Sequence, residues 1–236
     1  MKKVIISDYD KTFYISNEDI EKNKKTINQF REQGNLFMIA TGRSFWDFKN
    51  KVAAYNLEYN YVILNHGATI LDNNDNILYN ASINDNVIKD IKEDLQLPKS
   101  IRHFCCSKLE SRVDFNYKDL TKINVKYNEE IDAIKINELM NKKYGEYVNS
   151  YYIGKNSIEI ISNKTNKSKA IKLLMDKIEI NTHEIYTIGD GYSDIQMVKD
   201  FKGYCMKDSV KELKDVAIKE YDSVSELVKD ILNNIV

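Results

Sequence analysis

Two aspartates lie two residues apart, directly after the first apolar run of the chain. The run 4–6 (VII) leads into the segment 7–12 (SDYDKT), which contains Asp8 and Asp10. Side chains at positions i and i+2 of an extended chain point the same way, so both carboxylates can face one site. One could attack phosphorus while the other protonates the leaving oxygen and later activates water. A carboxylate attacks an anionic phosphate poorly unless a cation neutralises charge, so this chemistry needs a metal.

The same motif also has a simple structural interpretation. An isolated D-x-D-x-T segment after a strand serves equally well as a helix cap or as a solvated acidic surface. Asp8 and Asp10 therefore need support from elsewhere in the chain.

A second acidic pair lies in the segment 189–194 (GDGYSD), which follows another apolar run. Asp190 and Asp194 can offer oxygen ligands to Mg²⁺, a hard cation that prefers a few carboxylates and water. The glycines permit the tight turn that would bring both acids to one edge of a sheet. A turn with an acidic N-cap would explain Asp194, but it would not explain Asp190 as well.

Two weaker signals lie between the acidic pairs. Thr41 and Gly42 end a second apolar run, where a hydroxyl and free N–H groups can hold phosphate oxygens. Lys169 lies near the start of a predicted helix, where its point charge could bind a phosphoryl group and keep Asp8 ionised. Alone, the first pair is typical of helix capping. Lys169 belongs to a basic run with Lys164, Lys167 and Lys172.

The elements that would position these residues alternate between strand and helix. Apolar runs at 36–40 and 61–64 follow the first one, separated by helical patterns, and a hairpin is predicted at 69–79. The rhythm returns with a helix at 167–178, strands at 185–188 and 203–206, and helices at 194–201, 210–217 and 224–232. This order predicts right-handed crossovers and a parallel sheet. Ligands of such sheets bind at the carboxyl ends of the strands, where all the motifs lie.

Residues 83–157 break this rhythm. They contain predicted helices at 87–95 and 131–144 and strand-like runs at 101–106, 112–117, 122–127 and 147–152. The segment is too large for a loop. We therefore expect a discontinuous α/β core, residues 1–82 and 158–236, with an inserted α+β cap at 83–157.

The motifs in this order, with this insertion, resemble the haloacid dehalogenase (HAD) superfamily over essentially the whole chain, and its Cof-type branch in particular. The resemblance implies a Rossmann-like three-layer α/β core and a Mg²⁺-dependent phosphatase of sugar or cofactor phosphates. It implies Asp8 as nucleophile and metal ligand, and Asp10 as general acid/base with its backbone carbonyl on the metal. The remaining implied roles are phosphate binding by Thr41, Gly42 and Lys169, and metal binding by Asp190 and Asp194.

The sequence departs from the family pattern at several positions. Lys11 stands where glycine is usual, Ser193 where asparagine is usual, and His66 replaces another asparagine. Arg43, beside the Thr41-Gly42 pair, could reach substrate or anchor the cap, and the anchor is favoured. In the cap, Arg102, His103 and Arg112 could bind an anionic or sugar substrate, although a solvated surface would explain each of them equally well.

Two other functions remain open at the level of sequence. A phosphomutase of the same superfamily would use the same aspartates but return the phosphoryl group to the sugar. A non-catalytic domain that binds phosphate esters could have kept the fold, and Lys11 and Ser193 favour it. The intact set of Asp8, Asp10 and Asp190 argues against it, because a binding module needs no nucleophile.

Composition limits the classes of partner that the protein is expected to bind. The 236 residues carry a formal net charge of −1, so no single-sign field would draw the protein onto nucleic acid or a membrane. The three cysteines lack metal-binding spacing, and no stretch resembles a signal peptide or a membrane span. We expect a cytoplasmic protein acting on a small phosphorylated metabolite, with its oligomeric state left open.

Overall fold

The core of the molecule is a mixed sheet of eight strands. The structure, a computed structural model, describes residues 2–180 and 183–236. The core strands are β1 Val4–Ser7, β2 Leu36–Ala40, β3 Tyr61–Leu64, β4 Thr69–Asp72, β5 Ile77–Asn80, β11 Ile185–Gly189, β12 Lys202–Met206 and β13 Glu220–Tyr221. Their spatial order is β13-β12-β11-β1-β2-β3-β4-β5. Strands from β13 to β3 are parallel, and β4 and β5 add an antiparallel edge.

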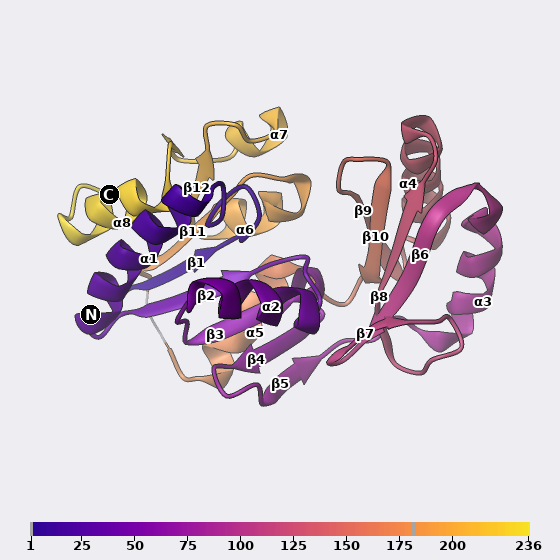
Figure 1. Cartoon of the computed structure of the whole chain (residues 1–236), viewed down its shortest axis with the longest axis horizontal. Helices are drawn as coiled ribbons and strands as arrows, with labels where there is room; N and C mark the ends of the chain where they lie inside the picture. The colour runs from indigo at the N-terminus through magenta and orange to yellow at the C-terminus, as the bar shows by residue number, and fades with distance from the viewer. Residues whose placement is uncertain (1, 181–182) are drawn as a thin grey trace.

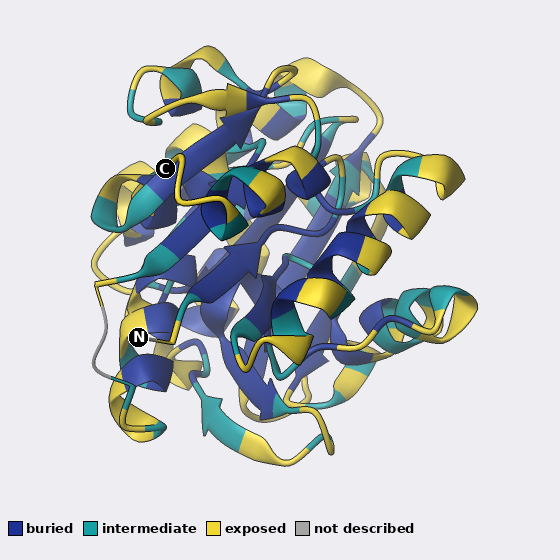
Figure 2. Cartoon of the chain, turned by 90° about the vertical axis from the view of Figure 1, so that its left-hand side faces the viewer, coloured by how far each residue is buried: buried dark blue, intermediate teal, exposed yellow. Residues whose placement is uncertain are grey.

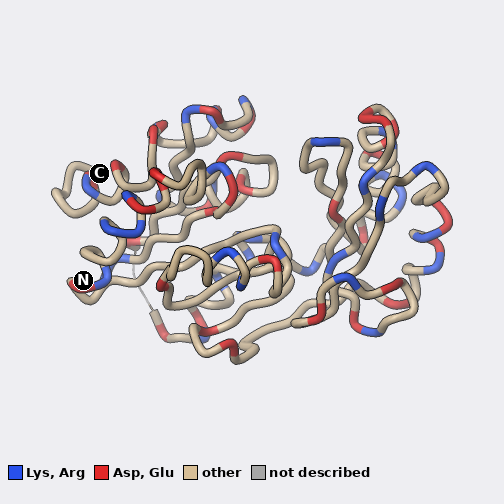
Figure 3. The backbone as a smooth tube through the Cα atoms, viewed as in Figure 1, with Lys and Arg blue, Asp and Glu red and all other residues tan. Residues whose placement is uncertain are grey.

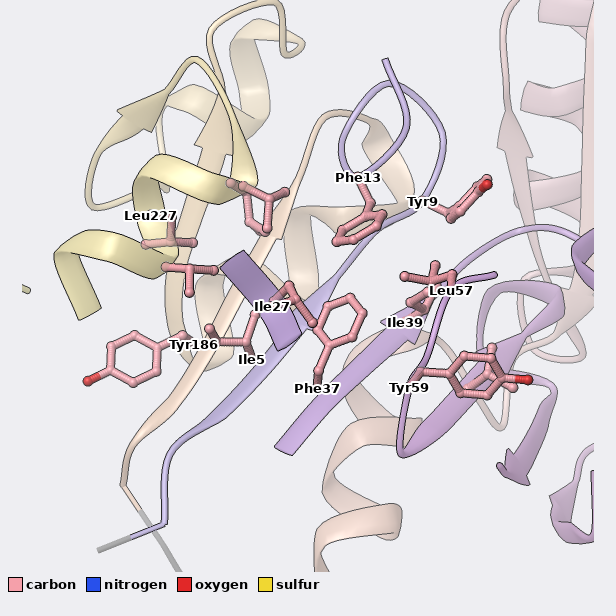
Figure 4. Close-up of a cluster of buried hydrophobic side chains, with 14 of the residues drawn as sticks. Ile5, Tyr9, Phe13, Ile27, Phe37, Ile39, Leu57, Tyr59, Tyr186 and Leu227 are labelled. Atoms are coloured by element: carbon pink, nitrogen blue, oxygen red, sulfur yellow. The ribbon is translucent and has the colours of Figure 1, made fainter. Parts of the chain in front are cut away.

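Helices cover both faces of this sheet. One layer contains α1 Asn17–Glu32, α2 Phe45–Tyr55 and α8 Val224–Leu232, and the other contains α5 Lys167–Lys177, α6 Ile195–Asp200 and α7 Lys211–Lys214. Alternate residues of β1 face the two layers. Ile5 joins the first buried cluster, part of which Figure 4 shows, and Val4 and Ile6 join the second. The strands are accordingly buried while the outer sides of the helices are exposed (Figure 2).

The cap is a separate antiparallel sheet with two helices. Its elements are α3 Asp85–Asp94, β6 Ser100–Ser107, β7 Glu110–Val113, β8 Leu120–Tyr127, α4 Glu130–Tyr144, β9 Val148–Tyr152 and β10 Ser157–Ser162. The strand order is β7-β6-β8-β10-β9. Figure 1 shows α3 and α4 on the side of this sheet away from the core. Short 3-10 turns lie at Asn65–Gly67, Leu97–Lys99 and Tyr192–Asp194.

The predicted fold class, a parallel α/β core with an inserted α+β cap, is confirmed. The predicted hairpin is β4–β5. Helix α1 begins after Ser16, whose side chain accepts from the amide of Asp19. The predicted end of the cap at residue 157 falls inside β10. Because β10 pairs with β8 and β9, the cap sheet continues to Ser162.

Candidate active site

Asp8 lies at the carboxyl end of β1, in the middle of the core sheet. Its amide continues the sheet ladder by donating to the carbonyl of Ile188 at 2.9 Å, and its side chain is only 7% exposed. The chain then turns through Lys11, whose φ of 60° lies in the left-handed region. Lysine adopts this conformation at a cost that glycine avoids. The turn therefore forms with a lysine in the backbone conformation that glycine adopts most readily.

Asp190 and Asp194 approach Asp8 from the end of the neighbouring strand, β11. One oxygen of each of these three carboxylates lies within 4.8 Å of the others. The Asp194 carboxylate is held by the amides of Asp190 and Gly191, at 3.1 and 3.0 Å. Gly189 makes this packing possible, because a Cβ there would lie 2.5 Å from Cβ and Cγ of Asp194. The predicted acidic turn thus reaches the predicted nucleophile.

The lysine that reaches this cluster is Lys167, and not Lys169 as predicted. The Lys167 Nζ donates to Asp8 Oδ1 and to Asp194 Oδ1, both at 2.6 Å, from a side chain that is 1% exposed. Lys169 is exposed, and its Nζ donates to the carbonyl of Asn163. Asn166 caps α5 by accepting from the Lys169 amide, so Lys167 is the first helical residue and turns into the sheet edge.

The electrostatics of this cluster fit a divalent cation. Burial raises the pKa of Asp8 well above its usual value, and the nearby Asp194 and Asp190 add to the shift, while Lys167 opposes it. Burial and Asp194 raise the pKa of Asp190 to about 6. Burial works against the Lys167 ammonium, but Asp194 and Asp8 raise its pKa. Three carboxylates around one ammonium leave an excess of negative charge, and oxygen donors suit Mg²⁺.

Asp10 lies beside this cluster and is held by Arg43. The guanidinium donates from Nε to Asp10 Oδ2 at 2.7 Å and from Nη2 to Asp10 Oδ1 at 2.6 Å. Arg43 therefore anchors a core carboxylate, and the favoured prediction that it anchors the cap is wrong. Thr12 donates to Asp190 Oδ1 at 3.1 Å and links the two acidic turns.

Thr41 and Gly42 end β2 at the same edge of the sheet. Thr41 is 1% exposed, its amide donates to Ile63, and its hydroxyl accepts from the Arg43 amide. A Cβ on Gly42 would lie 2.4 Å from the ring of His66, so this position has no room for a side chain. Both residues line the same cleft as Asp8.

A buried polar cluster at the junction of cap and core lies over this loop. Glu159 on β10 accepts from Lys122 Nζ at 2.8 Å and contacts His66 Nε2 at 2.5 Å, and Lys122 also donates to the Gly42 carbonyl at 2.5 Å. All three side chains are less than 10% exposed. We did not predict Lys122 or Glu159 as site residues. A signal existed, since Glu159 interrupts the isoleucine run at 158–161.

The two domains enclose a cleft of about 610 Å³. Its floor carries Asp8, Asp10, Asp190 and Asp194 from the core, and its opposite wall comes from the cap sheet. Arg102 and Arg112 line it, whereas His103 does not. A family model of haloacid dehalogenase-like hydrolases matches residues 5–116 and 102–227. The chain belongs to this family.

The HAD family assignment is accompanied by similarity over nearly the whole chain. An uncharacterised protein of Mycoplasma capricolum is 28% identical, covering 85% of this chain and 88% of the relative. The 5-amino-6-(5-phospho-D-ribitylamino)uracil phosphatase YbjI of Escherichia coli is 20% identical, covering 84% and 82%. A solved haloacid dehalogenase-like hydrolase of Bacteroides thetaiotaomicron superposes with a TM-score of 0.80 at 18% identity, covering 98% and 100%. The Cof-type resemblance is confirmed.

Proposed function

We propose that this HAD hydrolase is a Mg²⁺-dependent phosphatase of small phosphorylated metabolites that works through an aspartyl-phosphate on Asp8. The observation that carries the proposal is the placement of Asp8. It lies buried at the centre of the sheet edge, paired with Lys167 and beside Asp190 and Asp194, in a cleft under the cap. A carboxylate that is shielded from water in this way is suited to attack phosphorus, whereas a purely structural carboxylate would more commonly lie at the surface.

The chain's own residues account for both steps. In the first, an Asp8 oxygen forms a bond to phosphorus, the bond to the leaving oxygen breaks, and that oxygen takes a proton from Asp10. In the second, water gives its proton to Asp10 and attacks phosphorus, and the bond to Asp8 breaks. Arg43 holds Asp10 in a fixed orientation, facing the cleft. Lys167 and the Thr41-Gly42 turn would hold the phosphoryl oxygens.

The metal would be held by Asp8, Asp190 and Asp194. When bound, Mg²⁺ supplies charge neutralisation, which lets a carboxylate approach an anionic phosphate. The implied backbone contact of Asp10 with the metal remains part of this proposal.

Every helix within residues 2–180 and 183–236 is too short or too polar to cross a membrane.

Phosphate release from a panel of sugar and cofactor phosphates tests the proposal. We expect release by the wild type to require Mg²⁺ and to fall at least about 10³-fold in Asp8→Asn. Asp176→Asn, which changes an exposed aspartate on α5, is the matched control and should behave as wild type. Activity that survives Asp8→Asn would reject Asp8 as nucleophile. Weak release that rises with a sugar bisphosphate would point to a mutase, and binding without any turnover would point to a regulatory domain.

A further inference from the structure

The cap presents a polar face to the cleft, and the strand register determines which residues lie on it. On β6, Arg102 and Phe104 line the cleft. Their neighbours point the other way, since Cys105 belongs to the buried cluster of the cap and His103 contacts Phe115 of that cluster. The period of two along a strand therefore separates the cleft wall from the cap interior. It also places Arg102 on the cleft wall and His103 on the opposite side of the strand, a distinction that could not be made from the sequence alone.

Two guanidinium groups share the ring of Phe104. The Cζ atoms of Arg102 and Arg112 lie 5.4 and 5.7 Å from the ring centroid. Arg112 lies on β7, which pairs with β6, so both side chains reach the ring from adjacent strands. A planar guanidinium stacked on an aromatic ring keeps its N–H donors free for a carboxylate or a phosphate.

These arginines lack the close acidic partners that Arg43 and Lys122 have in the same cleft. Arg43 is paired with Asp10, and Lys122 with Glu159. Within residues 2–180 and 183–236, Arg102 has no ion pair, and Arg112 approaches Asp47 only at 3.6 Å with a side chain that is 62% exposed. Two like charges near one ring repel each other, so the fold gains little from placing them there.

The charge of Arg102 and Arg112 is a feature of this wall and not of the whole molecule. The protein has a formal net charge of −1, and Figure 3 shows basic and acidic residues mixed over both domains. The floor of the same cleft is acidic before a cation binds. A cleft of about 610 Å³ is also larger than a phosphate group needs. It has room for a leaving group that extends from the floor to the cap.

We infer that Arg102 and Arg112, which both lie against the ring of Phe104, form a second anion subsite, and that the substrates are phosphomonoesters whose leaving group carries another phosphate or a carboxylate. The inference rests on the proposed function, because it places the scissile phosphate at Asp8. The cap arginines then select the substrate by the far end of its leaving group. A carboxylate and a phosphate each present two oxygens that can accept two parallel N–H bonds from one guanidinium.

Three compounds with a common 6-phosphate test the inference: glucose 6-phosphate, 6-phosphogluconate and glucose 1,6-bisphosphate. We expect wild-type kcat/KM to be about 10-fold higher for a compound with the second anion, through a lower KM. The double variant Arg102→Gln/Arg112→Gln should lose this preference. Arg102→Lys should keep part of it, because the charge remains while the fork is lost. Lys135→Gln, an exposed change on α4 away from the cleft, should keep all of it.

The outcomes separate this inference from the proposed function. A wild type that hydrolyses glucose 6-phosphate through Asp8 but shows no preference, or a double variant that keeps the preference, would overturn the subsite alone. A preference for glucose 1,6-bisphosphate alone would show that the subsite requires a phosphate. A preference for both 6-phosphogluconate and glucose 1,6-bisphosphate would show that it accepts either anion. If none of the three compounds is hydrolysed, the panel of sugar and cofactor phosphates decides the proposed function, and calorimetric binding of the same three compounds to wild type and double variant decides the subsite. Raised salt should weaken the preference.

Discussion

At the scale of single residues, the site depends on which of two nearby lysines turns into the sheet edge. Lys167 and Lys169 are two positions apart, so they point about 200° apart around α5. Motif spacing predicts a lysine near this helix start, but a run of four lysines offers several candidates. Only burial distinguishes them, and burial depends on packing against Asp8 and Asp194, which lie far away in the sequence.

The first prediction compares these two lysines. Lys167→Met should lower kcat/KM for phosphate release by at least about 10²-fold, because the phosphoryl group and Asp8 lose their fixed cation. Lys169→Met should change it by less than about 2-fold, because its ammonium donates to a backbone carbonyl at the surface. Steady-state kinetics on one substrate gives both values. A larger loss in Lys169→Met would restore the interpretation made from the sequence.

The second prediction concerns Gly42. An added Cβ would lie 2.4 and 2.5 Å from Cε1 and Nε2 of His66. The ring cannot retreat easily, since Glu159 holds it and Tyr151 packs against it at 5.2 Å. Gly42→Ala should therefore lower the free energy of unfolding by about 1–3 kcal/mol in urea denaturation. Gly191→Ala is the control, because the nearest atom to its Cβ is 3.9 Å away. Equal effects of the two changes would contradict this account.

At the scale of elements, most of the fold was predictable because its strands are short apolar runs between capped helices. The predicted strands at 4–6, 36–40 and 61–64 correspond to β1, β2 and β3. β10 was missed as part of the cap because its pairing with β8 is long-range in the sequence, and no local pattern assigns a strand to one sheet or the other. The cap–core contacts of Lys122 and Glu159 were missed for the same reason.

The third prediction uses the buried pair at this junction. Although burial alone would raise the pKa of Glu159, Lys122 and His66 lower it from 4.5 to about 2. As the pH falls, the Glu159 carboxylate takes up its proton in the unfolded state before it does so in the folded state. Its contribution to the free energy of unfolding is therefore present above about pH 4.5 and is lost as the pH falls toward 2. Burial lowers the pKa of His66, which adds a loss of the same sign below about pH 6.5.

Urea denaturation between neutral pH and about pH 3.5 measures this contribution. Glu159 should account for a loss of about 1–1.5 kcal/mol in the wild type over that range, and Glu159→Gln should lack it. Glu58→Gln, at an exposed ion pair, is the control and should keep the wild-type slope. If Glu159→Gln is too unstable because Lys122 is left unpaired, the double change Lys122→Met/Glu159→Met gives the same comparison. Parallel slopes in all variants would contradict the shift.

At the scale of the whole molecule, metal binding should appear as thermal stability. The fourth prediction is that Mg²⁺ at about ten times its Kd raises the Tm by roughly 3–6 °C, because the folded cluster binds it and the unfolded chain does not. Asp190→Asn replaces a charged carboxylate of the cluster by a neutral amide and should abolish most of this shift, while Asp176→Asn should keep it. Differential scanning calorimetry with and without Mg²⁺ provides the test. An equal shift in both variants would show that Mg²⁺ binds elsewhere.

The last prediction follows from how the two domains are joined. The buried cluster of the cap is built from residues within 83–160, and those residues include Ile158 and Ile160 of β10. The cap therefore contains its own core, although the chain enters and leaves it through the α/β domain. The face that it turns toward the cleft is polar or charged at Arg102 and Lys122, so water can cover that face when the core is absent.

We expect the excised segment 83–163 to fold alone, with cooperative unfolding and a free energy of about 3–5 kcal/mol. The segment 83–157, cut at the boundary first predicted from the sequence, should not fold. It lacks most of β10, the strand that joins β8 to β9, and without that strand the sheet loses a row of hydrogen bonds on each side. Circular dichroism during urea denaturation separates the two segments. Similar cooperative transitions in both would mean that β10 is dispensable to the cap, and failure of both would mean that the cap needs the core to fold.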